Sequence, residues 1–84
     1  MQLSIITPDR KVYEGEVESA TFPGVKGAFQ VLRNHAPIIS SLTKGPVKYR
    51  NQAGESKVTI TGGVVEVLDN NITLLAESVL DLEQ

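Results

Sequence analysis

The chain has 84 residues, of which 40% are hydrophobic and 21% charged, with no cysteine and a formal net charge of −2. This composition is typical of one globular domain over residues 1–84, and it excludes disulfides, thiolate nucleophiles and cysteine-ligated zinc or iron. The weak negative charge argues against a nucleic-acid partner. Because the sequence has no long apolar run and no basic leader, we expect no membrane span and no secretion signal.

Short β-strands are predicted along the first part of the chain. Residues Gln2–Ile6 are β-formers that alternate in character, and a Pro-Asp turn follows them. We expect a strand to resume at Lys11–Tyr13 and to be interrupted by Gly15, and a further strand to run from Val17 to Phe22.

The stretch from Pro23 to Pro37, PGVKGAFQVLRNHAP, combines turn-forming residues with a short apolar run. Gly24 and Gly27 permit the backbone angles of a tight turn, and the closing proline disfavours helical geometry just before it. We expect a turn, a very short strand and a second rigid turn, with an apolar anchor made of Phe29, Val31 and Leu32. The second turn would display Arg33, Asn34 and His35 on a fixed corner.

The second half of the sequence begins with one strand and a hairpin. Ile38–Leu42 is apolar or small throughout, as in a strand or turn that is covered on both sides. Val47–Arg50 and Glu55–Thr61 alternate in character around a turn, which predicts an antiparallel hairpin. The glycine pair Gly62-Gly63 then predicts a bulge, a corner or a close approach between two backbones.

A second hairpin is predicted from Val64–Leu68 and Ile72–Ala76, because the Asp-Asn-Asn turn between them tolerates left-handed backbone angles. Both faces of this hairpin carry apolar residues; Leu74 and Leu75, for example, point in opposite directions. Either another chain covers one of the faces or the hairpin lies at the centre of the domain, and the sequence leaves both explanations open.

The tail Glu77–Gln84 is expected to form one turn of helix at most, because isolated helices below about 12–15 residues are marginal. No longer helical period occurs elsewhere in the sequence. About ten short strands separated by Gly, Pro, Asn and Asp therefore predict an all-β fold, either a sandwich or a small barrel.

The candidate chemical sites are weak. His35 is the only histidine and there is no cysteine, so we interpret it as a packed turn histidine or a protein contact rather than a metal ligand or catalytic base. Gly24, Lys26 and Gly27 would suit a phosphate-binding loop only if a helix followed, and the next residues are strand-like. Lys44, in TKGPVK, is the candidate attachment site if the chain is a lipoyl or biotinyl carrier. We expect no cofactor, metal or catalytic site.

Four segments resemble the epsilon subunit of the F-type ATP synthase, specifically its N-terminal β-sandwich, in their order and spacing. They are LSIITPDRKVYEGEVES, PGVKGAFQVLRNHAP, TGGVVEV and NNITLLAE, and together they span essentially the whole chain. The resemblance implies two five-stranded antiparallel sheets packed face to face, in a non-catalytic subunit that turns with the central stalk. It also implies binding to the gamma subunit and the c-subunit ring, and a peripheral position at the cytoplasmic face of the energy-transducing inner membrane, with membrane contact only through other subunits.

The resemblance also assigns interface residues by position. The corner with His35 would lie near the rotor contacts, and the loop from Lys26 to Gln30 would face the polar loops of the ring. Three residues depart from the usual pattern, which implies a less acidic ring contact and a less rigid corner: Ala28 replaces a frequent glutamate, Gln30 a common glycine and Arg33 a frequent proline. The candidate interface residues are Lys26, Ala28, Gln30, Arg33, Asn34 and His35.

The helical hairpin that commonly follows the sandwich in this family is missing from these 84 residues. Inhibition by inserted helices and nucleotide sensing by that hairpin are therefore not implied here. Two functions of other classes remain as alternatives, a lipoyl or biotinyl carrier domain and a free-standing recognition module.

Overall fold

The computed structural model describes residues 1–83, with side chains for residues 1–81. This part of the chain forms ten strands and contains no helix long and apolar enough to cross a membrane. In chain order the strands are β1 (Gln2–Ile6), β2 (Lys11–Glu16), β3 (Ser19–Gly24), β4 (Gly27–Leu32), β5 (Ile38–Leu42), β6 (Gly45–Asn51), β7 (Gly54–Ile60), β8 (Gly63–Leu68), β9 (Asn71–Ala76) and β10 (Val79–Glu83).

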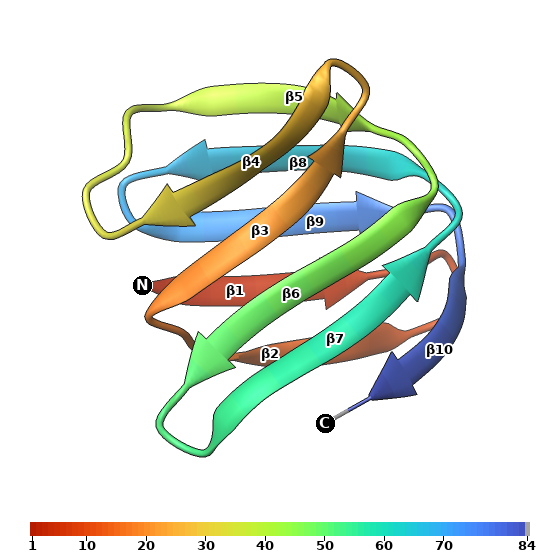
Figure 1. Cartoon of the computed structure of the whole chain (residues 1–84), viewed down its shortest axis with the longest axis horizontal. Helices are drawn as coiled ribbons and strands as arrows, with labels where there is room; N and C mark the ends of the chain where they lie inside the picture. Colours follow the sequence, from red (N-terminus) through yellow and green to blue (C-terminus); the bar gives the residue numbers. More distant parts are fainter. Residues whose placement is uncertain (84) are drawn as a thin grey trace.

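The strands form two layers, shown in Figure 1 with one layer running diagonally across the other. The front sheet has the order β4-β3-β6-β7-β10, and the back sheet has the order β5-β8-β9-β1-β2. The two sheets are joined at one point, where Gly24 of β3 pairs with Leu42 of β5. The prediction of an all-β sandwich of two sheets is confirmed, with one strand pair, β1 and β9, running parallel.

The core lies between the two layers, and the buried side chains among residues 1–81 are apolar apart from the hydroxyl of Tyr49. Alternate residues of most strands point into it, such as Leu3 and Ile5 of β1, as the two-residue period of a strand requires. Tilted aromatic pairs fill part of it: the ring centroids of Tyr13 and Tyr49 are 4.4 Å apart, and those of Phe22 and Phe29 are 5.8 Å apart. The largest fully buried side chains are Tyr49, Phe22, Leu3, Ile5, Ile60, Ile72, Leu74, Val31, Val47, Val58, Val65 and Val67.

Both predicted hairpins are confirmed, β6 with β7 and β8 with β9. The second one turns through Asp69 and Asn70, whose φ angles are 50° and 62°, the left-handed values that a tight hairpin turn needs at both central positions. The close backbone approach predicted at Gly62-Gly63 is also present. A Cβ on Gly63 would collide with the carbonyl oxygen of Leu75 on the neighbouring strand.

The strand boundaries near the N-terminus differ from the prediction. Gly15 does not interrupt β2, because it pairs with Leu3 of β1 and its missing side chain leaves room for the ring of Tyr13. The next strand begins at Ser19 rather than Val17. Val17 is buried in the connection, where its N–H donates to the carbonyl oxygen of Met1.

The prediction for the tail was wrong. Instead of a helical turn, residues Val79–Glu83 form β10, which pairs antiparallel with the outer edge of β7. The backbone N–H of Thr59 also donates to the carboxylate of Asp81 at 3.2 Å. A short segment that is unstable as a helix thus gains its backbone partners from an existing sheet edge. Gln84 lies outside the described residues.

Two expectations about burial were also wrong. Leu32 is 52% exposed and does not belong to the apolar anchor, which consists of buried Val31 and half-buried Phe29. Ile38–Leu42 forms β5 as predicted, but it is not covered on both sides within the described chain, because Ile39 is 73% exposed.

Candidate protein-interaction surface

The outer face of the back sheet carries a group of exposed apolar side chains, here called the apolar face: Ile39, Val64, Leu68 and Leu75. Their exposed fractions range from 41% for Val64 to 73% for Ile39. They come from β5, β8 and β9, and their sequence neighbours in these strands, such as Val65 and Leu74, fill the core. Strands buried on one side normally carry polar residues on the other, so this face departs from the ordinary pattern.

Strand register aligns the side chains of the outer face in rows. One row contains Val64, Leu75 and Ile6, which are direct partners across β8, β9 and β1. The next row contains Ile39, Glu66 and Thr73, across β5, β8 and β9. Directly opposed side chains in neighbouring strands lie in contact range, so the apolar face is continuous around Glu66.

The apolar character ends toward β2. There the Lys11 ammonium lies 2.9 Å from a carboxylate oxygen of Glu14, and the Ser4 hydroxyl reaches the other oxygen at 3.5 Å. The hydrogen bond from Lys11 holds the pKa of the Glu14 carboxyl below its ordinary value. This edge of the back sheet is therefore charged and solvated, and the apolar face lies to one side of the sheet.

Two shallow depressions hollow the apolar face. One, of about 420 Å³, is lined by Pro37, Ile38, Ile39, Glu66, Val67 and Leu68. The other, of about 230 Å³, is lined by Ile39, Val64, Glu66, Thr73 and Leu75. Both share Ile39 and Glu66, so these two residues form the ridge between them.

The outer face of the front sheet is different in chemistry. Its register aligns Thr21, Lys48 and Lys57 in one row, and Ser19, Arg50 and Glu55 in another. Polar and charged residues on the solvent side of a sheet are what an uncovered surface requires. The exposed leucines of this sheet lie on its two edge strands, Leu32 on β4 and Leu80 on β10. Of the two described outer faces, the back sheet therefore presents the larger group of neighbouring apolar side chains, which suits it to a partner.

The corner between β4 and β5 lies beside the apolar face and is attached to it by two asparagines. The backbone N–H of Asn34 donates to Oδ1 of Asn70 at 2.6 Å, and Nδ2 of Asn70 donates to Oδ1 of Asn34 at 3.1 Å. Both residues have left-handed φ angles, 66° and 62°, which asparagine tolerates better than most residues. We call this pair of hydrogen bonds the asparagine clasp.

His35 is half-buried next to the clasp. Its backbone N–H donates to the carbonyl oxygen of Leu32 at 3.1 Å, and its ring Nδ1 lies 2.7 Å from the carbonyl oxygen of Ala36. Because a carbonyl only accepts, this contact requires the proton on Nδ1 and leaves Nε2 as an acceptor in the neutral ring. The ring is thus fixed in one orientation.

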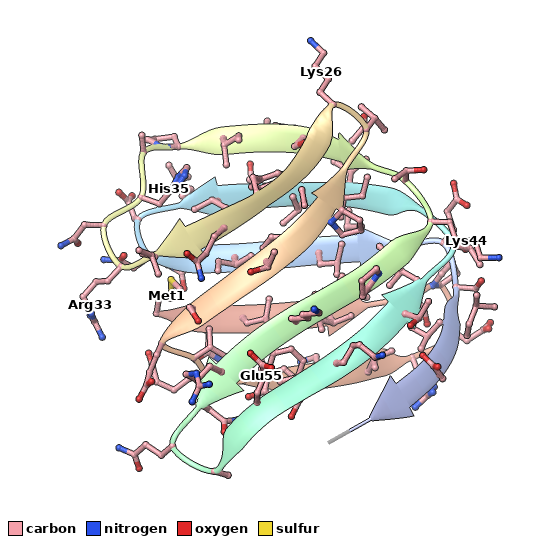
Figure 2. All side chains as sticks on the ribbon, in the orientation of Figure 1. Met1, Lys26, Arg33, His35, Lys44 and Glu55 are labelled. Atoms are coloured by element: carbon pink, nitrogen blue, oxygen red, sulfur yellow. The ribbon has the colours of Figure 1, made fainter. Side chains whose placement is uncertain are left out.

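The candidate residues predicted from the sequence do not gather at one point. Figure 2 shows Lys26 at the tip of the β3–β4 hairpin and Arg33 with His35 at the far end of β4. Ala28 and Gln30 lie between them, exposed on β4, whose core-facing positions are Phe29 and Val31. The six residues therefore form two regions, a hairpin tip and a corner, connected by one edge strand.

The two loops with alternative interpretations have clear structures. Gly27 has a φ of 125° and closes a tight turn with Gly24, and β4 follows directly, so the loop lacks the helix that a phosphate cradle uses. Lys44 lies between β5 and β6, strands that belong to different sheets. It is therefore not at a hairpin tip, the position that a carrier lysine needs.

Sequence reasoning missed three residues of this surface. Ile39 was expected to be covered, Asn70 was only a turn residue, and Glu66 was one acid among ten. The apolar residues on both sides of the β8–β9 hairpin were the available signal and include Val64, Leu68 and Leu75, but the sequence did not tell which of the two sides is exposed.

Comparisons with known proteins agree with this architecture. Residues 1–81 match the family model of the ATP synthase delta/epsilon chain β-sandwich domain. The chain is 43% identical over 77 residues to an ATP synthase epsilon chain of Pelotomaculum thermopropionicum, covering 92% of this chain and 58% of the relative. It is 36% identical over 84 residues to an ATP synthase epsilon chain of Shouchella clausii, covering all of this chain and 63% of the relative. The chain thus spans about three-fifths of the length of these relatives.

Solved structures share the fold. A chain in the Euglena gracilis mitochondrial ATP synthase, described as OSCP/F1/c-ring, superimposes with a TM-score of 0.85 at 21% identity, covering 93% of this chain and 51% of that one. A chain in the central stalk/c-ring of the Tetrahymena thermophila mitochondrial ATP synthase gives a TM-score of 0.80 at 20% identity, covering 95% and 65%. The fold, the family model and the sequence relatives together show that this chain belongs to the family of ATP synthase delta/epsilon chain β-sandwich domains.

Proposed function

We propose that this chain is the β-sandwich of a central-stalk subunit in an F-type, proton-translocating ATP synthase. In this role it binds the gamma subunit and the c-subunit ring and helps to couple proton flow to ATP synthesis. It has no catalytic site of its own, since catalysis belongs to other subunits. It is peripheral, at the cytoplasmic face of the membrane, and meets the membrane only through other subunits.

The observation that carries the proposal is the apolar face. Four large apolar side chains are exposed together on one side of the sandwich, while the outer face of the front sheet is mostly polar and its exposed leucines, Leu32 and Leu80, lie on opposite edge strands. Contiguous exposed apolar patches on small domains mark protein–protein contacts. We assign this face to the gamma subunit, because a permanent stalk contact benefits most from an apolar surface that is covered at all times.

The corner extends the same contact. Arg33, Asn34 and His35 lie beside the depression lined by Pro37 and Leu68, and the asparagine clasp ties them to the turn that begins after Leu68. We therefore assign these three residues to the rim of the gamma contact.

The hairpin tip is assigned to the second partner. Lys26 protrudes at the β3–β4 turn, and Ala28 and Gln30 follow on the exposed side of β4 (Figure 2). In our assignment this tip meets the polar loops of the c-subunit ring. With alanine at position 28 the contact has no carboxylate on this strand, so its strength depends on hydrogen bonds from Lys26 and Gln30.

The rival function, a carrier domain, has less support. A carrier needs its modified lysine on a projecting hairpin, and Lys44 connects two strands of different sheets. The intact mass of the protein from its own cell discriminates the two functions, because a carrier gains the mass of lipoate or biotin and a stalk subunit does not.

The proposal is tested with two matched substitutions of exposed leucines. Leu75→Ser alters the apolar face and Leu80→Ser alters β10 in the front sheet, and the two side chains are 54% and 55% exposed. We expect Leu75→Ser to weaken binding to an ATP synthase complex depleted of this subunit by about tenfold or more, and Leu80→Ser to have little effect. Equal affinities for both variants would refute the assignment of the apolar face.

A further inference from the structure

One charged residue, Glu66, lies among the four side chains of the apolar face. It lies on β8 between Ile39 on one neighbouring strand and Thr73 on the other. Val64 and Leu68 flank it on its own strand, and it lines both depressions. Any partner that covers the apolar face therefore covers this carboxylate as well.

Within residues 1–81, no opposite charge neutralises Glu66. Among residues with described side chains, none forms an ion pair or a hydrogen bond with its carboxylate. Along its own row the next charged residue is Glu14, another acid, three strands away on β2. Lys11, in the adjacent row on β2, is already paired with Glu14 at 2.9 Å.

Covering an unpaired carboxylate is costly. A carboxylate that loses its water and gains no opposite charge is strongly disfavoured, and charged residues are accordingly depleted at the centres of protein interfaces. An acid at the middle of an apolar contact is therefore matched by a cation on the partner, or it opposes the contact.

We infer that the partner surface on the apolar face presents one basic side chain, an arginine or a lysine, to Glu66. The inference rests on the proposed function, in which that partner is the gamma subunit, and it specifies the chemistry of the contact. The two depressions beside Glu66, of about 420 and 230 Å³, provide space for a long basic side chain. Its alkyl stem would lie against Ile39 and Leu68 or Leu75, as the stems of lysine and arginine commonly do on apolar surfaces.

The pairing gives the contact a definite register. Apolar surfaces alone pack in several neighbouring positions, whereas a single opposite-charge pair favours one position and disfavours shifted ones. In a rotating stalk, such a pair would fix the orientation of the sandwich on the gamma subunit. Glu66 is thus a specificity residue of the interface.

The test replaces Glu66 with residues whose effect on binding shows whether the partner group is a cation or a neutral group. Glu66→Gln keeps the shape and one acceptor oxygen but removes the charge, and Glu66→Lys reverses it. Glu55→Gln, on the β6–β7 hairpin of the front sheet (Figure 2), is the matched control with the same charge change. Binding of each variant to the complex depleted of this subunit is titrated, and a melting curve of each checks that the sandwich folds.

We expect Glu66→Gln to weaken binding by about tenfold or more, Glu66→Lys to weaken it further, and Glu55→Gln to leave it unchanged. If the partner group were a neutral hydrogen-bond donor, Glu66→Gln would lose little affinity. If Glu66 became protonated on binding, Glu66→Gln would bind as tightly as the unaltered chain or more tightly. Either result would overturn the inference. Failure of the proposed function is distinguishable, because in that case Leu75→Ser also leaves binding unchanged.

A second measurement identifies the basic residue. Basic residues of the gamma subunit are replaced by glutamine one at a time and titrated against the unaltered chain and against Glu66→Gln. The true partner is the residue whose replacement weakens binding to the unaltered chain but causes no further loss with Glu66→Gln. If every replacement has the same effect on both chains, Glu66 has no cationic partner on gamma.

Discussion

Asn34 and Asn70 hold each other across a separation of 36 residues, through hydrogen bonds of 2.6 and 3.1 Å. The two residues lie in different turns, one after β4 and the other between β8 and β9. The clasp therefore joins the turn after β4, an edge strand of the front sheet, to the β8–β9 hairpin, which carries most of the apolar face. The clasp holds the corner together with the hydrogen bond from the N–H of His35 to the carbonyl oxygen of Leu32.

Removing the clasp is expected to loosen the corner without unfolding the sandwich. Asn70→Gly retains the left-handed backbone of position 70 and removes both clasp hydrogen bonds. We expect the free energy of unfolding to fall by about 1–2 kcal/mol and the amide of Asn34 to exchange with solvent faster. Hydrogen exchange followed by NMR measures this amide directly, with the amide of Ala53, which is bonded to Asn51 in a distant turn, as the internal control. Unchanged exchange at Asn34 would show that the corner is held by other contacts.

His35→Ala is expected to separate binding from stability. The side chain is half-buried and its one ring contact is to the neighbouring residue, so we expect a loss of no more than about 1 kcal/mol in unfolding free energy. Affinity for the complex depleted of this subunit should fall about five- to thirty-fold if the ring lies in the gamma contact. Poorer coupling of ATP hydrolysis to proton pumping in reconstituted vesicles should accompany it. A much larger loss of stability would identify His35 as a core residue, and unchanged affinity and coupling would remove it from the interface.

Gly63→Ala is expected to be strongly destabilising. The added Cβ would collide with the carbonyl oxygen of Leu75 and lie 3.0 Å from Cα of Ala76, at a φ of 157°. Because both neighbours are backbone in the paired strand, the hairpin must shift, and we expect a cost of about 2 kcal/mol or more. Gly54→Ala is the control, since its φ is 123° but nothing lies within 4 Å of the added atom. Denaturant titration measures the free energy of unfolding of both variants. A larger loss of stability in Gly54→Ala than in Gly63→Ala would contradict this explanation.

Tyr49 should make the protein sensitive to high pH. Burial raises the pKa of its hydroxyl above the ordinary value of 10.0, and a nearby Ser56 has a smaller effect in the opposite direction. The Ser56 side chain does not form a hydrogen bond with the buried oxygen. Because the pKa of Tyr49 is higher in the folded than in the unfolded chain, the protonated hydroxyl favours the folded state. This contribution to the free energy of unfolding is fully present below the unfolded pKa and is lost as the pH rises toward the folded pKa.

Tyr49→Phe tests this prediction. It removes a buried hydroxyl that has no hydrogen-bond partner among the described residues, so we expect the free energy of unfolding at neutral pH to be unchanged or up to about 1 kcal/mol higher. The loss of stability above about pH 10 should also become smaller. Tyr13→Phe is the comparison, because the Tyr13 hydroxyl accepts a hydrogen bond from Asn51 at 3.3 Å. A variant at position 49 that is clearly less stable at neutral pH would show that the hydroxyl has a partner in solution.

Local signals in the sequence were sufficient for much of the fold. The β8–β9 hairpin was predictable because its turn needs left-handed angles and contains Asp69 and Asn70, which accept them. The tail was not, since β10 exists only because β7 offers a free edge that is distant in sequence. A strand's neighbours are decided by the whole topology, so a short apolar segment alone does not reveal them.

The same distinction explains the interaction surface. Alternation along Val64–Leu68 indicated two apolar faces, but only the register with β5 shows that Ile39 joins one of them and that Glu66 lies inside it. The asparagine clasp spans 36 residues and leaves no local pattern. The six residues assigned by resemblance remain predictions of the interface, arranged in two regions at either end of β4.

The most direct test of the docking assignment uses the absence of cysteine from the chain. Single variants Leu75→Cys on the apolar face, and Leu80→Cys and Lys48→Cys on the front sheet, are alkylated with a maleimide, first as free chain and then within the assembled ATP synthase. If the apolar face is the gamma contact, position 75 is labelled rapidly in the free chain and at least about tenfold more slowly in the assembly, while positions 80 and 48 are labelled at similar rates in both. Labelling at position 75 that is equally fast in the assembled complex would contradict the docking of gamma on the apolar face.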